Sequence, residues 1–74
     1  MRYKVDFLWD AEARVWVATS KDVPGLVLES KSFDKLVGKV RQAIPELVAM
    51  NGKETQPCSF SISTTREETI PAYG

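Results

Sequence analysis

The first segment of the chain alternates between apolar and polar residues. Apolar side chains occupy every second position from residue 3 to residue 9, as Tyr3, Val5, Phe7 and Trp9. The positions between them hold Lys4, Asp6 and Leu8. Because neighbouring side chains of a β-strand point to opposite faces, this period of two predicts a strand with one face in a core. Residues 58 to 63 repeat the pattern, with Cys58, Phe60 and Ile62 separated by serines, and predict another strand of this kind.

The segment from Arg14 to Ser20 is a strand of a different kind. Its centre, residues 15 to 18, is apolar at both odd and even positions, so both faces of the strand are apolar. This is typical of a strand in the middle of a sheet. The register of this strand stays open, because a shift by one residue exchanges its two faces. The residues turned away from the rest of the core are either Trp16 and Ala18 or Val15 and Val17.

A turn separates this strand from the next one. Pro24 fixes φ at the second turn position, and Gly25 accepts the positive φ that a type II turn requires at the third. Residues 26 to 30 then predict a third strand. The first, second and third strands are therefore joined by short connections and are expected to be antiparallel hairpin partners.

Residues 33 to 48 carry the strongest periodic signal in the sequence. An apolar stripe at helical spacing consists of Phe33, Leu36, Val37, Val40, Ile44, Leu47 and Val48. Ser32 is placed to cap the start of this helix, and Asn51 with Gly52 provides a left-handed stop. Pro45 lies on the polar side and removes one backbone hydrogen bond. We expect either a bend around the core or a break, with Pro45 opening a second short helix.

These elements follow the order β-β-β-α-β and define an α+β fold. A helix that crosses back over the sheet brings the last strand parallel to the first. The expected strand order is 3-2-1-4, with a single helix on one face of the four-stranded sheet. The opposite face keeps apolar surface in the open. Exposed apolar surface marks contact sites, so we expect a protein partner or a second copy of the chain to cover it.

Composition narrows the chemistry that the chain can perform. Its 74 residues form one domain, residues 1–74, with a core of about residues 2–64 and a tail of residues 65–74. Ten basic and ten acidic residues cancel, which does not suit direct binding of nucleic acid. The lack of histidine excludes imidazole-based catalysis and the common zinc sites. We expect no catalytic residue, no metal and no cofactor.

The single cysteine, Cys58, cannot form an internal disulfide, which favours a reducing compartment. Within an alternating strand it is expected to be a small buried apolar side chain. The amino-terminal residues interleave charges with apolar side chains, unlike a signal peptide. No apolar run approaches the roughly 20 residues of a membrane span. We expect a cytoplasmic protein without membrane contact.

One stretch of sequence resembles a known family. The stretch W-D-A-E-A-R-V-W-V-A-T-S-K-D-V-P-G-L-V-L-E-S is followed by S-F-D-K-L and A-I-P-E-L. Its more specific positions are Trp9, Glu12, Ala13, Trp16, Ala18, Ser20, Asp22, Pro24, Gly25, Leu26 and Glu29. From Tyr3 to Leu47 the chain resembles the HicB-like antitoxin domain, and most closely its small stand-alone branch of unknown function. The resemblance implies a partial RNase H-like fold, which agrees with the order of elements above.

The resemblance also implies a protein-binding role. HicB-like antitoxins inhibit a small ribonuclease toxin, HicA, by occluding its surface, and many carry a carboxy-terminal DNA-binding segment. Residues 64–74 are too few for such a segment. The expected function is therefore a non-enzymatic interaction module, most concretely an antitoxin-like inhibitor of a small basic mRNA-cleaving toxin. The alternative is a dimeric scaffold or regulatory subunit, since such domains commonly self-associate.

Five residues are candidates for the partner interface: Trp9, Trp16, Val27, Ile70 and Tyr73. Tryptophan is enriched at protein interfaces, but each tryptophan also fits plain core packing or the stacking of a nucleobase. In the tail, Glu67 and Glu68 stand beside Ile70 and Tyr73. The tail either docks into an apolar groove of a partner, with its acids imitating a nucleic-acid backbone, or stays disordered.

A degenerate RNase H-like nuclease is the third hypothesis. Two-metal nucleases need several carboxylates around two ions about 4 Å apart. Asp6 is the candidate on the first strand, and Glu29 and Glu46 are the acids that can approach it in principle. The alternative is that these acids are solvated and keep the sheet soluble.

Overall fold

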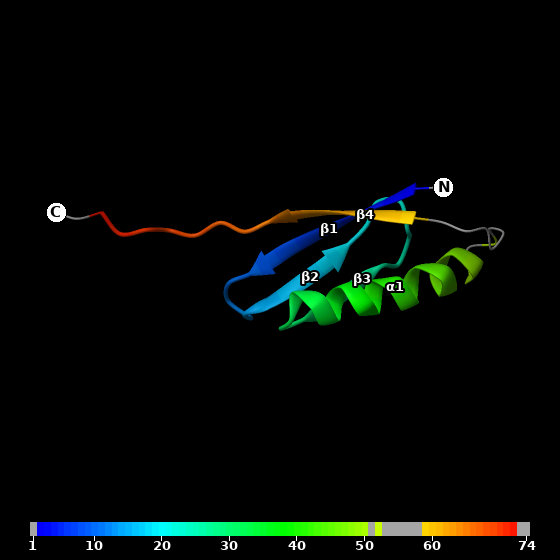
Figure 1. Cartoon of the computed structure of the whole chain (residues 1–74), viewed down its shortest axis with the longest axis horizontal. Helices are drawn as coiled ribbons and strands as arrows, with labels where there is room; N and C mark the ends of the chain where they lie inside the picture. Colours follow the sequence, from blue (N-terminus) through cyan, green and yellow to red (C-terminus); the bar gives the residue numbers. More distant parts are fainter. Residues whose placement is uncertain (1, 51, 53–58, 73–74) are drawn as a thin grey trace.

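The computed structural model of the chain describes residues 2–50, 52 and 59–72. Its elements are β1 (Arg2–Asp10), β2 (Val15–Thr19), β3 (Val27–Ser30), α1 (Phe33–Met50) and β4 (Ser59–Thr65). The strands form one mixed sheet in the order β3-β2-β1-β4 (Figure 1). β1 is antiparallel to β2 and parallel to β4, and β2 is antiparallel to β3. The α+β class, the order of elements and the strand order predicted from the sequence are confirmed.

α1 covers one face of the sheet and lies against β2 and β3 (Figure 1). The buried core between the helix and the sheet consists of Tyr3, Val5, Phe7, Ala18, Val23, Leu26, Leu36, Val40, Ile44 and Val48. Tyr3, Val5 and Phe7 are on the face of the first strand that the alternation predicted to be buried, and the buried helix residues belong to the predicted stripe. Burial of these side chains is the main stabilising contribution in a domain of this size.

The structure settles the register of β2. Ala18 pairs with Phe7 on one side and with Leu28 on the other, and it is completely buried under the helix. Its small side chain leaves room for Phe33 of α1, whose ring centre lies 4.9 Å from that of Phe7. Val17 has the opposite parity and therefore faces away from the helix.

The second strand begins one residue later than the sequence predicted. Arg14 was expected to open the second strand, but it has a φ of 56° and lies in the turn before β2. Its N–H donates to the carbonyl oxygen of Asp10 at 2.7 Å. The Asp10 carboxylate also accepts the N–H groups of Glu12 and Ala13, both at 3.1 Å. These local hydrogen bonds satisfy the loop backbone and hold Arg14 in the left-handed region.

The turn before β3 has the predicted geometry. Gly25 has a φ of 86°, and the N–H of Leu26 donates to the carbonyl of Val23 at 3.2 Å. The Ser20 hydroxyl accepts the N–H of Asp22 at 3.1 Å and that of Val23 at 3.2 Å, and it donates to the Lys4 carbonyl at 2.6 Å. The turn is therefore attached to β1, which positions β3 at the edge of the sheet.

Both ends of α1 follow the prediction, but its middle does not break. The Ser32 hydroxyl accepts the N–H of Lys35 at 3.2 Å, as a helix cap does. Gly52 has a φ of 75° and donates to Ala49 at 3.1 Å. Pro45 lies inside one continuous helix, so the second short helix is absent from the described residues. Asn51 lies outside them.

β4 ends later than the sequence pattern indicated. It runs to Thr65, which pairs with Leu8 of β1, so the tail starts at Arg66. Phe60 and Ile62 face the helix side and the serines are exposed, as predicted. The expectation that Cys58 is buried falls outside the described residues. Within residues 2–50, 52 and 59–72, no helix combines the length and the apolar character needed to cross a membrane.

Candidate protein-interaction surface

The face of the sheet turned away from α1 carries an apolar patch. Leu8 of β1 pairs directly with Val17 of β2, and paired residues share one face of a sheet. The same parity places Val15 and Val27 on this face. We call these four residues, Leu8, Val15, Val17 and Val27, the open-face patch. Leu8 is 50% exposed and Val27 70%, whereas Val15 and Val17 are half-buried.

Polar side chains surround the open-face patch. Thr19 stands between Asp6 and Val27 in one cross-strand row, and Glu29 pairs with Val17 in the next. Lys4 pairs with Ser61 further along the face. An apolar centre with a polar rim is the usual composition of a protein-binding surface. Asp10 pairs with Val15, so the carboxylates of Asp6, Asp10 and Glu29 all stand beside the apolar residues. They favour a partner with basic groups around an apolar contact.

A shallow hollow lies beside the patch and is lined by Lys4, Asp6, Lys21 and Asp22. Its two lysines and two aspartates balance in charge. The Asp22 carboxylate accepts the backbone N–H of Lys4 at 2.7 Å, so this acid already stabilises the turn before β3. The hollow therefore adds polar side chains of both charges to this surface.

The two tryptophans lie on the other face of the sheet, at the edge of the core. Trp16 packs edge-on against Phe33 at 5.1 Å between ring centres, and Trp9 lies 5.4 Å from Trp16. Both side chains are half-buried. Trp16 is packed against the buried core, which favours a structural role for most of its surface. An interface role for the exposed part of Trp9 remains a prediction.

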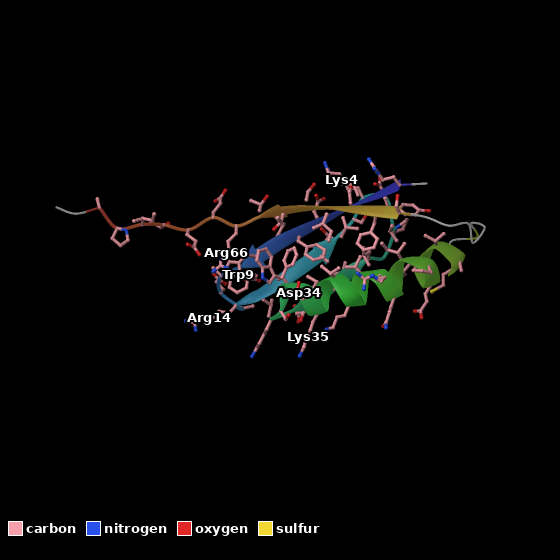
Figure 2. The ribbon with its side chains drawn as sticks, in the orientation of Figure 1. Lys4, Trp9, Arg14, Asp34, Lys35 and Arg66 are labelled. Atoms are coloured by element: carbon pink, nitrogen blue, oxygen red, sulfur yellow. The ribbon has the colours of Figure 1, made fainter. Side chains whose placement is uncertain are left out.

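The tail contacts this aromatic row through Arg66. The guanidinium carbon of Arg66 lies 4.5 Å from the centre of the Trp9 ring (Figure 2). Arg66 also forms an ion pair with Glu68 at 3.0 Å. Ile70 is 86% exposed. Tyr73 lies outside the described residues. The four predicted interface residues that the structure describes therefore do not form one surface: Val27 is on the open face, the tryptophans are on the helix side and Ile70 is in the tail.

The candidate acids of a nuclease are not gathered together. Asp6 and Glu29 share the open face, but β2 separates their strands and they stand in different cross-strand rows. Glu46 is exposed on α1, on the other side of the sheet. Among the described residues, no group of three His, Cys, Asp or Glu side chains is placed to hold a metal ion.

Sequence reasoning did not include Leu8 among the interface candidates. In the linear pattern Leu8 lies on the same face of the first strand as Lys4 and Asp6, opposite the residues predicted to enter the core. The signal that identifies its role is its pairing with Val17, which depends on the register of the hairpin. Leu8 and Val17 form a continuous apolar surface only because this register places them side by side.

The fold and this surface define a small α+β domain with one helix-covered sheet face and one open face. Residues 2–73 match the sequence model of a family described as a domain of unknown function, DUF1902, and the chain belongs to this family. The chain is also similar to the hypothetical protein TTHA1013 from the extremely thermophilic bacterium Thermus thermophilus, whose crystal structure is known. The two share 39% identity over 95% of this chain and 100% of that chain, with a TM-score of 0.81. No curated protein matches the chain.

Proposed function

We propose that this protein is a non-enzymatic interaction module whose open sheet face binds another protein. The observation that carries the proposal is the open-face patch, an apolar surface that α1 does not cover. Its most concrete form is an antitoxin-like inhibitor that occludes a small basic mRNA-cleaving ribonuclease of the HicA type. The resemblance of residues 3 to 47 to HicB-like domains supports this form, and so do the carboxylates of Asp6 and Glu29 at the rim.

A direct test is co-expression with the product of a neighbouring gene that encodes a small basic protein with a catalytic histidine. We expect this chain to relieve the growth arrest caused by that protein. Val17→Asp places a charge in the centre of the patch and should abolish the rescue. Ser61→Asp is the matched control, because Ser61 lies on the same face but outside the patch. Rescue by Val17→Asp, or no rescue by the unaltered chain, contradicts the inhibitor proposal.

The second candidate is a dimeric scaffold or regulatory subunit in which two open faces pair with each other. The direct pairing of Leu8 with Val17 favours it, because this apolar row is able to pack against the same row of another copy. Sedimentation equilibrium tests this candidate. Val17→Asp should convert a dimer held by this face into monomer, whereas Ser61→Asp should not.

Nuclease activity is the least supported of the three hypotheses, since Asp6, Glu29 and Glu46 lie apart. Its test is cleavage of single-stranded RNA and of an RNA–DNA hybrid in the presence of Mg²⁺ or Mn²⁺. We expect no cleavage by the purified chain. Metal-dependent cleavage that disappears in Asp6→Asn contradicts the assignment as a non-enzymatic protein.

A further inference from the structure

β4 is an edge strand whose apolar side chains are incompletely covered. β1 pairs with one side of β4, and in the described residues no strand lies along the other side. Phe60 and Ile62 face the helix side, but α1 lies over β2 and β3, so both remain half-exposed. An edge with unpaired backbone groups and partly exposed apolar side chains is a place where a further strand can add.

Residues 66–72, which we call the C-terminal arm, have the right length and shape for this strand. The arm continues β4 as extended chain and points away from the body of the domain (Figure 1). It has as many residues as β4, which has seven. All of its residues are exposed, and Ile70 is 86% exposed. The molecule therefore measures 58 Å along its longest axis but only 19 and 18 Å across.

We propose that two copies of the chain exchange these arms. In the dimer, the arm of each subunit pairs antiparallel with the outer edge of β4 of the partner, about a two-fold axis at the junction between β4 and the arm. Each arm then fills the edge that the other subunit leaves open, so the interface is reciprocal. The two sheets become one continuous sheet in which β4 of each subunit is no longer an edge.

The alternation of side chains along the chain fits this pairing. Even-numbered positions of β4 and the arm share the helix-side face, and the contact of Arg66 with Trp9 shows that the alternation continues into the arm. Directly opposite residues of an antiparallel pair share a face. If the axis passes through position 66, Ile70 lies opposite the partner's Ile62. If it passes through position 65, Ile70 lies opposite the partner's Phe60. In both registers Ile70 covers the apolar strip that α1 leaves open.

The remaining residues of the arm are compatible with the exchange. Glu67 points to the other face. It lies opposite the hydroxyl group of the partner's Thr65 if the axis passes through position 66, and opposite that of the partner's Ser63 if it passes through position 65. Arg66 and Glu68 form an ion pair within each arm, so charges of both signs stand at the axis. Pro71 lacks an N–H group, which suits the end of an edge strand. The exchange leaves the open-face patch free and is therefore independent of the proposed function.

Disulfide crosslinking tests the pairing in the full chain, with Cys58→Ser as background. Ile70→Cys is combined with either Ile62→Cys or Phe60→Cys, and the control combines it with Ser61→Cys on the opposite face. Positions 62 and 70 of one extended strand are about 26 Å apart, far beyond the roughly 6 Å between the Cα atoms of a disulfide. We expect a disulfide-linked dimer from a helix-side pair and at least about tenfold less from the control. An intramolecular disulfide, or equal yields from all pairs, overturns the proposal.

Sedimentation equilibrium provides the second measurement. The unaltered chain should be a dimer, and Ile70→Asp should raise its dissociation constant by at least about tenfold. Thr69→Asp adds the same charge on the other face of the arm and should change the constant by less than about threefold. Circular dichroism should show that both variants stay folded, because the arm lies outside the core. A monomeric unaltered chain, or equal effects of the two variants, contradicts arm exchange. If Val17→Asp abolishes the dimer and Ile70→Asp does not, the interface is the open face instead.

Discussion

The guanidinium carbon of Arg66 lies 4.5 Å above the centre of the Trp9 ring, and this contact fixes the point where the C-terminal arm leaves the sheet. A cation over an aromatic face contributes about 0.5–1 kcal/mol at an exposed site. The contact joins the arm to the aromatic row that runs through Trp16 to Phe33 of the helix. The direction of the arm is therefore coupled to the packing of the core edge.

The first prediction concerns this contact. Arg66→Ala should lower the free energy of unfolding by about 0.5–1 kcal/mol and should change the tryptophan fluorescence, because the ring of Trp9 loses its cover. Arg66→Lys keeps the charge and should lose less. Urea denaturation followed by fluorescence measures both effects. A loss as large in Arg66→Lys as in Arg66→Ala argues against the cation–π contact.

The second prediction separates the core role of Trp16 from an interface role. Trp16→Ala removes the edge-on contact with Phe33 and should cost about 3 kcal/mol. Val27→Ala, at a position that is 70% exposed, should change stability by less than about 0.5 kcal/mol. Thermal and urea unfolding give both values. If Trp16→Ala left stability unchanged while weakening association, Trp16 would be an interface residue instead.

The third prediction contrasts two prolines. Pro45 interrupts the hydrogen bonding of a continuous helix, so Pro45→Ala should stabilise the protein by about 1–3 kcal/mol. Pro24 restricts the unfolded chain at a turn position that suits proline. Pro24→Ala should therefore destabilise by about 0.4–1 kcal/mol. The two melting temperatures should move in opposite directions. A lower melting temperature for Pro45→Ala means that the helix depends on the local bend or packing of the proline ring.

The fourth prediction concerns the loop between β1 and β2. Arg14 has a φ of 56°, a conformation that costs a residue with a Cβ atom about 1 kcal/mol. Arg14→Gly should therefore raise the free energy of unfolding by up to about 1 kcal/mol. Arg14→Val should lower it, because β-branched side chains are the least suited to positive φ. Equal stabilities of the two variants are incompatible with the left-handed backbone at this position.

Much of the fold follows from local patterns in the sequence. The alternation of residues 3–9 and the helical stripe of residues 33–48 each identify their buried face without knowledge of the partner element. The turn at Pro24 and Gly25 and the cap at Ser32 follow from backbone chemistry alone. These features are local, so a single sequence is sufficient to predict them.

The register of β2 was not predictable in this way. Apolar residues of both parities occupy this strand, so either face satisfies the hydrophobic pattern. The choice depends on volume: Ala18 leaves space between Phe7 and Leu28 for the helix, whereas Trp16 fits at the end of the sheet beside Trp9. The start of β2 depends on the positive φ of Arg14. This conformation is usually signalled by a glycine, and position 14 holds an arginine. An apolar open face was predicted from the sequence, but its composition was not, because Leu8 and Val17 meet only in this register.

The place of β1 between β2 and β4 has a consequence for synthesis of the protein. The ribosome makes β1 first, but it makes one of the two neighbours of β1 only after the whole helix. Until residues 59–65 have been made, a nascent chain exposes one backbone edge of its most buried strand. Neighbouring nascent chains on the same messenger are then able to pair with that edge. Slow translation between the helix and β4 should therefore lower the yield of native protein more than slow translation anywhere before β3.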